Sequence, residues 1–105
     1  MHPRSPLTTL YNDIPNPLAT KHLSTLSFQP ATGWENEPVT YCGWRDVPSV
    51  YLVCEGDALL PPRVQVEMAE MAGAEVERCG AGHMVLLSEG ERVVEVVRRA
   101  AGELV

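Results

Sequence analysis

A chain of 105 residues with 45% hydrophobic residues has the size and composition of one small globular domain, or of part of a larger one. Its net charge of −6, with only 8 lysines and arginines, argues against nucleic acid or an anionic membrane as a partner. The apolar runs are too short for a transmembrane span, and the first residues lack the apolar core of a signal peptide, so we expect a soluble, cytoplasmic protein.

The cysteines give no sign of a metal or redox centre. Cys42, Cys54 and Cys79 are widely spaced, no C-x-x-C motif occurs, and no Cys/His cluster has the spacing of a zinc site. We therefore expect three reduced structural cysteines, no metal and no cofactor; a redox or metal role is the alternative.

Residues 1–45 are predicted to be mostly irregular. They contain six of the nine prolines, and their turn signals cluster around residues 28–38. One short helix is expected from Pro17 to Leu26, because proline suits the first helical turn and leucines recur on one side. A segment of this kind covers a site more often than it forms a core.

Residues 46–105 are far more regular. Ser49–Cys54 is a nearly continuous apolar run, which is typical of a strand buried on both faces of a parallel sheet. A helix is predicted over residues 62–72, with Pro62 in its first turn and Gly73 as its C-cap. Val64, Met68, Met71 and Ala72 mark one face of this helix. We expect the two methionines to pack in the core, with a binding surface as the alternative.

A second strand and a last helix complete the pattern. Glu75–Cys79 is the strand, and a glycine-rich turn over residues 80–83 follows it. Ser88 with Glu91 three residues later forms the signature of a capping box at the start of the helix. Gly102 is expected to end that helix. Its predicted buried face contains Val93, Val94, Val97, Ala100 and Ala101.

The order strand–helix–strand–helix implies two parallel strands with a right-handed connection. Asp57 follows the first strand and His83 follows the second, so both lie in loops that leave carboxyl ends of strands. Such loops are neighbours, and ligands of open α/β sheets bind beside them. The sequence therefore predicts that Asp57 and His83 come together as a candidate site.

These residues resemble the C-terminal half of an α/β-hydrolase, most closely the small methylesterase and hydroxynitrile-lyase-like enzymes and their fungal relatives found near secondary-metabolite genes. The matching segments are VPSVYLVCEGDALLP, CGAGH and LSEGERVV. In that family an acid stands in a D-x-x-x-P context with a glutamine eight residues later, matched here by Asp57, Pro61 and Gln65. The base stands in a G-x-H or G-G-x-H turn, to which the glycine-rich turn of Gly80, Gly82 and His83 is similar.

The resemblance implies a partial α/β-hydrolase fold with two parts. Residues 1–45 would be a remnant of the cap, in which Tyr11–Asp13 and the leucine-rich helix after them resemble the end of the family's cap. Residues 46–105 would be the C-terminal β-α-β-α unit. It also implies that Asp57 and His83 are the acid and base of a Ser-His-Asp triad. The nucleophile elbow G-x-S-x-G does not occur in the 105 residues, and the serines present lack its flanking glycines.

Each of these residues also has a simpler interpretation. His83 could be an exposed turn histidine, Asp57 a turn residue or helix cap, and Tyr11–Asp13 a local turn motif. Glu55 is a second acidic candidate, although it points from the strand end rather than from the loop. The spacing of 26 residues between Asp57 and His83 favours the triad interpretation, because it fits one helix and one short strand.

Two functions follow from this pattern. The first is an esterase-type hydrolase that acts on a small-molecule ester-like substrate and contributes to secondary metabolism, with the nucleophile supplied from outside these residues. The second is a truncated, non-catalytic remnant that acts as a binding partner. In either case a two-stranded sheet leaves strand edges bare, so we expect self-association through an exposed edge.

Overall fold

The computed structural model describes residues 5–33 and 35–102, and it shows an α/β fold. Strands β1 (Val50–Cys54) and β2 (Glu75–Cys79) form a two-stranded sheet. The strands are parallel, with a register that runs from Val50 opposite Glu75 to Cys54 opposite Cys79. The predicted strands and their parallel pairing are thus confirmed, with β1 one residue shorter at its start.

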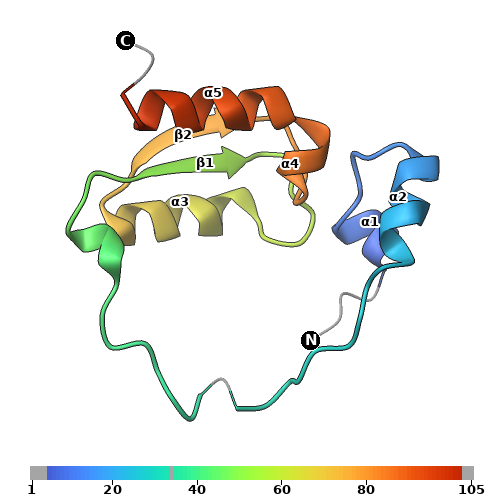
Figure 1. The fold of residues 1–105 in the computed structure, drawn as a ribbon, viewed down its shortest axis with the longest axis horizontal. Helices are drawn as coiled ribbons and strands as arrows, with labels where there is room; N and C mark the ends of the chain where they lie inside the picture. Colours follow the sequence, from blue (N-terminus) through green and yellow to red (C-terminus); the bar gives the residue numbers. More distant parts are fainter. Residues whose placement is uncertain (1–4, 34, 103–105) are drawn as a thin grey trace.

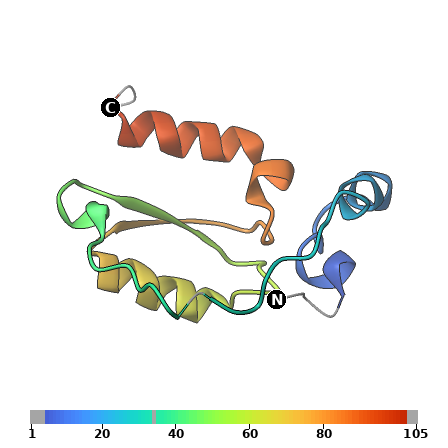
Figure 2. The ribbon, with the colours of Figure 1, turned by 60° about the horizontal axis from the view of Figure 1, so that its bottom comes forward.

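Two helices enclose this sheet. Helix α3 (Pro62–Ala72) covers one face, and α5 (Gly90–Ala100) covers the other (Figures 1 and 2). The short α4 (Val85–Ser88) leads from the end of β2 into α5. Together they form the expected β-α-β-α unit, and Val53 at its centre is fully buried.

The bounds of α3 are those that the sequence predicts, but its buried face differs. Gly73 ends the helix with φ of 67°, a left-handed conformation that glycine adopts without strain. Gln65 and Ala69 are buried, whereas Met68 and Met71 are 45% and 84% exposed. The prediction that the methionines pack in the core is wrong, because the stripe that meets the sheet is centred on Gln65 and Ala69.

The start of the last helix also differs from the prediction. Ser88 is the final residue of α4, and its buried hydroxyl has no hydrogen-bond partner among the described residues and caps no helix. The chain turns at Glu89 and α5 begins at Gly90. Val96 is the buried residue of α5, while Val94 and Val97 are 57% and 60% exposed. The predicted valine face therefore points largely to solvent.

The N-terminal segment contains two short α-helices where the sequence predicts one. They are α1 (Pro6–Thr9) and α2 (Asn16–Leu23), and a 3-10 turn, η1 (Gly43–Arg45), precedes β1. Pro17 lies in the first turn of α2 as expected. The helix ends three residues early because the hydroxyls of Ser24 and Thr25 donate hydrogen bonds to carbonyls of its last turn.

Helices α1 and α2 lie beyond the carboxyl ends of the strands, next to the loops that follow them (Figures 1 and 2). A small buried cluster holds this region together, and Leu23 and Met84 pack against it. The cluster consists of Leu10, Tyr11, Ile14 and Ala19. Within the described residues, no helix is long and apolar enough to cross a membrane. The division into residues 1–45 and 46–105 stays a prediction.

Candidate functional site

The loops that carry Asp57 and His83 run side by side because their backbones are bonded to each other. The N–H of Glu55 donates to the carbonyl of Cys79 over 2.8 Å, and the N–H of Gly56 donates to that of Ala81 over 3.0 Å. The parallel register thus continues past the ends of both strands. This continuation brings the two candidate residues to one place.

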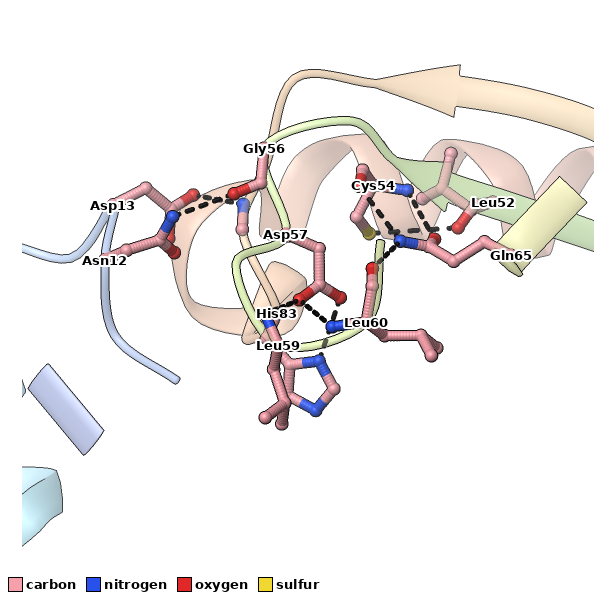
Figure 3. Close-up of polar contacts among 11 residues, drawn as sticks. Asn12, Asp13, Leu52, Cys54, Gly56, Asp57, Leu59, Leu60, Gln65 and His83 are labelled. Carbon is pink, nitrogen blue, oxygen red and sulfur yellow. Dashed lines mark hydrogen bonds and ion pairs between the residues drawn. The ribbon is translucent and has the colours of Figure 1, made fainter. Parts of the chain in front are cut away.

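The structure brings Asp57 and His83 into direct contact. Nδ1 of His83 lies 2.9 Å from Oδ2 of Asp57. The Asp57 side chain is 4% exposed and the His83 side chain 32%. The other carboxylate oxygen, Oδ1, accepts hydrogen bonds from the N–H groups of Leu59 and Leu60 over 2.8 and 2.9 Å (Figure 3). The carboxylate is therefore fixed from both sides.

These contacts determine the ionisation of Asp57. Burial raises its pKa, but hydrogen bonds from the Leu60 N–H, the His83 ring and the Leu59 N–H outweigh burial and hold the pKa below the ordinary value of 3.8. Asp57 is therefore a carboxylate at neutral pH. A carboxylate on Nδ1 favours the tautomer in which Nδ1 carries the proton and Nε2 has a free lone pair.

Gln65 supports this site from α3. It is 2% exposed, and its amide accepts from the N–H of Cys54 over 2.8 Å and donates to the carbonyl of Cys54 over 3.0 Å. It also donates to the carbonyl of Leu60 over 2.8 Å. Gln65 thus ties the end of β1 to the turn that holds Asp57. In the sequence, the position of Gln65 eight residues after Asp57 is the signal for this supporting role.

Cys54 is unsuited to act as a nucleophile. Burial raises the pKa of its thiol to about 12, with the neighbouring Cys79 and Asp57 adding to the effect. The thiolate is the nucleophilic form, so Cys54 is unreactive at neutral pH. All three cysteines are free thiols, as expected from the sequence.

An open hollow of about 300 Å³ borders the pair. It is lined by Val50, Tyr51, Leu52, Cys54, Asp57, Leu60, Gln65 and His83. Among residues 5–33 and 35–102, no side chain hydrogen-bonds to Nε2 of His83, and no group of three or more His, Cys, Asp or Glu side chains could hold a metal ion. The arrangement provides an oriented base beside an open space.

Two further residues reach the site from the N-terminal segment. Asn12 donates to the carbonyl of Gly56 over 2.8 Å, and Asp13 accepts from the N–H of Gly82 over 2.7 Å (Figure 3). The sequence gives this segment only a resemblance to the end of a cap or a local turn. No local pattern reveals these contacts, because the bonded residues are 44 and 69 positions apart.

Comparison with known proteins agrees with this geometry. The profile of the alpha/beta hydrolase family matches residues 3–96. An alpha/beta hydrolase of Aspergillus novofumigatus, nvfD, is 38% identical over 98 residues, which cover 91% of this chain and 39% of the relative. No solved structure matches the chain significantly.

The parallel sheet with a helix on each face makes this an α/β protein. The chain belongs to the alpha/beta hydrolase family. It spans 39% of the length of the fungal relative that it matches.

Proposed function

We propose that Asp57 and His83 are the acid and base of a Ser-His-Asp triad whose serine lies on polypeptide outside the 105 residues. The observation that carries this proposal is the 2.9 Å contact between Nδ1 of His83 and Oδ2 of Asp57, with Nε2 left towards open space. In this role His83 takes a proton from the serine hydroxyl and returns it to the leaving group, while Asp57 stabilises the imidazolium.

The substrate class that fits is a small ester-like molecule, since this type of triad activates serine for attack on acyl carbons. The hollow beside His83 contributes Tyr51, Leu52 and Leu60 as apolar contacts for part of such a substrate. The three free cysteines suit the reducing cytoplasm that the sequence predicts. A place in secondary metabolism stays a prediction from the sequence resemblance.

A chimera tests the proposed function. Residues 1–105 would replace the matched region of the Aspergillus novofumigatus relative, and hydrolysis of p-nitrophenyl acetate and butyrate would be measured beside the parent relative. We expect the chimera to hydrolyse an ester that the parent hydrolyses. His83→Ala should reduce kcat/KM by about 10³-fold or more, because removal of one triad member disables the whole triad.

Two controls make this experiment decisive. His22→Ala changes a half-buried histidine of α2 that lies outside the Asp57–His83 pair, and it should leave the rate unchanged. The 105-residue chain alone should give no rate above buffer, since it lacks the nucleophile elbow. An active parent with a folded but inactive chimera would show that the pair is not a working acid and base here.

A binding role without catalysis is the second candidate function. A second hollow of about 360 Å³ lies between η1, β1 and α3, and it is lined by Cys42, Trp44, Arg45, Tyr51, Met68, Met71 and Ala72. Trp44 is 50% exposed there and Met71 84%. Exposed aromatic and methionine side chains are common in protein interfaces. A folded, inactive chimera together with stable association of the chain would favour this function.

A further inference from the structure

Asn12 and Asp13 each contact a different loop of the Asp57–His83 pair. The amide of Asn12 binds the carbonyl of Gly56, the residue directly before Asp57. The carboxylate of Asp13 binds the N–H of Gly82, the residue directly before His83. Two adjacent side chains therefore join the two loops, in addition to the backbone bonds that join them at the strand ends.

The fit between these side chains and the loops is tight. A Cβ at position 82 would lie 2.2 Å from Oδ1 of Asn12 and 2.7 Å from Oδ1 of Asp13. Real Cβ atoms do not approach polar atoms this closely, so an alanine at position 82 would push Asn12 and Asp13 away. Gly82 itself is buried and its φ is not positive, so the backbone there would accept an alanine.

The segment that carries Asn12 and Asp13 is itself anchored. Tyr11 and Ile14, the residues on either side of the pair, are 5% and 6% exposed and belong to the buried cluster of the N-terminal segment. Met84, the residue directly after His83, packs against the same cluster. The cluster therefore fixes the backbone of residues 11–14 relative to the turn that carries His83.

We propose that Asn12 and Asp13 are positioning residues, which hold the Asp57 loop and the His83 loop at the spacing that the Nδ1–Oδ2 bond needs. They do not touch His83 or Asp57 and act through Gly56 and Gly82. The proposal deepens the proposed function, because the orientation of His83 matters for catalysis only if His83 is the base. Whether the two residues orient the ring can be tested without any catalytic turnover.

The test compares two alanine substitutions in the same turn of the 105-residue chain. Gly82→Ala drives Asn12 and Asp13 from the loop, whereas Gly80→Ala is the matched control, since a Cβ at position 80 would meet nothing within 4 Å. The readout is the tautomer of the neutral His83 ring, measured from its ¹⁵N chemical shifts. Circular dichroism establishes that each variant is folded.

We expect the parent and Gly80→Ala to have the proton on Nδ1 of His83. In Gly82→Ala the population of this tautomer should fall by more than about half, because the tautomer depends on the hydrogen bond that Nδ1 makes. Retention of the Nδ1–H tautomer in folded Gly82→Ala would overturn the proposal. Equal loss in both glycine variants would also overturn it, because it would assign the effect to loop flexibility alone.

A second pair of variants removes the contacts without adding atoms. Asn12→Ala/Asp13→Ala should reproduce the tautomer change of Gly82→Ala. Asp13→Asn should retain the parent tautomer, because its side-chain carbonyl still accepts from the Gly82 N–H. These variants decide the question if Gly82→Ala fails to fold, and an unchanged tautomer in the folded double variant refutes the positioning role.

Different results would contradict the positioning role of Asn12 and Asp13 and the triad role of Asp57 and His83. An inactive chimera with a normal tautomer response would refute the triad but leave the positioning role of Asn12 and Asp13 intact. In an active chimera, Asn12→Ala/Asp13→Ala should lower kcat with little change in KM, because the two residues orient the base and do not touch the substrate. A change in KM alone would contradict the positioning role.

Discussion

The N-terminal helices and the β-α-β-α unit cover their apolar side chains to different degrees. Around α1 and α2, the cluster residues Leu10, Tyr11 and Ile14 are 8%, 5% and 6% exposed, although this part of the sequence is rich in proline. In the regular unit, Val94 and Val97 of α5 are 57% and 60% exposed. Regular secondary structure and complete burial are therefore separate properties in this chain.

The two regions differ in what their apolar side chains contact. The N-terminal segment buries its own cluster and adds contacts to the two site loops. The β-α-β-α unit holds a fully buried centre at Val53 and Ala69 but presents apolar surface on both of its longer helices.

The largest expected effect concerns the site in the β-α-β-α unit. In the chimera, Asp57→Asn should lower kcat by about 10⁴-fold, because an amide no longer holds the catalytic tautomer of the base. Asp46→Asn, at an exposed carboxylate far from His83 in the sequence, serves as the matched control and should leave the rate unchanged. An active Asp57→Asn chimera would show that Asp57 does not act as the acid of a triad.

The second effect concerns the centre of the sheet. Val53→Ala removes buried methyl groups at a fully buried position and should lower the free energy of unfolding by about 2–3 kcal/mol. Urea denaturation followed by circular dichroism measures this change. Val39→Ala, at a position that is 81% exposed, should change it by less than about 0.5 kcal/mol. Equal decreases in the free energy of unfolding for Val53→Ala and Val39→Ala would mean that the β-α-β-α unit lacks a packed centre.

The third effect is a pH dependence that arises from Asp57. Its pKa in the folded chain lies below the ordinary value of 3.8, so the unfolded chain binds more protons in acid. The Asp57 carboxylate therefore stabilises the folded chain fully above pH 3.8. This stabilisation is lost as the pH falls through the lower pKa of the folded chain. Unfolding free energies between about pH 6 and pH 2 should fall more steeply in the parent than in Asp57→Asn. Parallel curves would show that Asp57 is not stabilised as a carboxylate.

The smallest effect concerns association through the sheet edge, which the sequence predicts. Light scattering should give a mass above that of the 11.5 kDa monomer as the concentration rises. Val50→Lys places a charge on β1, one of the two edge strands, and should shift the distribution towards monomer. Val39→Lys adds the same charge in the irregular segment and should not. A monomer at all concentrations would rule out the edge as an interface.

Much of the β-α-β-α unit could be predicted from local signals. Pro62 and Gly73 mark the ends of α3, and the apolar run before Cys54 identifies β1. The contact between Asp57 and His83 follows from strand order, since loops at the same ends of parallel strands are neighbours. The capping-box prediction at Ser88 is wrong because tertiary packing turns the chain at Glu89 and buries the hydroxyl.

The bonds of Asn12 and Asp13 to the two site loops could not be predicted from the sequence. Asn12 and Asp13 lie in a stretch that reads as a turn, and their partners are distant in the sequence. Whether a polar side chain bonds to solvent or to a distant loop depends on where α1 and α2 pack. That packing rests on the cluster around Tyr11 and Ile14, which has too few residues for a clear periodic pattern.

The amide of Gln65 occupies the position that one residue of a neighbouring strand would take. It satisfies both the N–H and the carbonyl of Cys54 on the side of β1 that faces away from β2. Any strand that pairs with this side can bond near Val50 and Leu52 but must diverge before Cys54. In an extended sheet, Gln65 would therefore separate β1 from such a strand at Cys54. The space between the two strands would open next to Asp57.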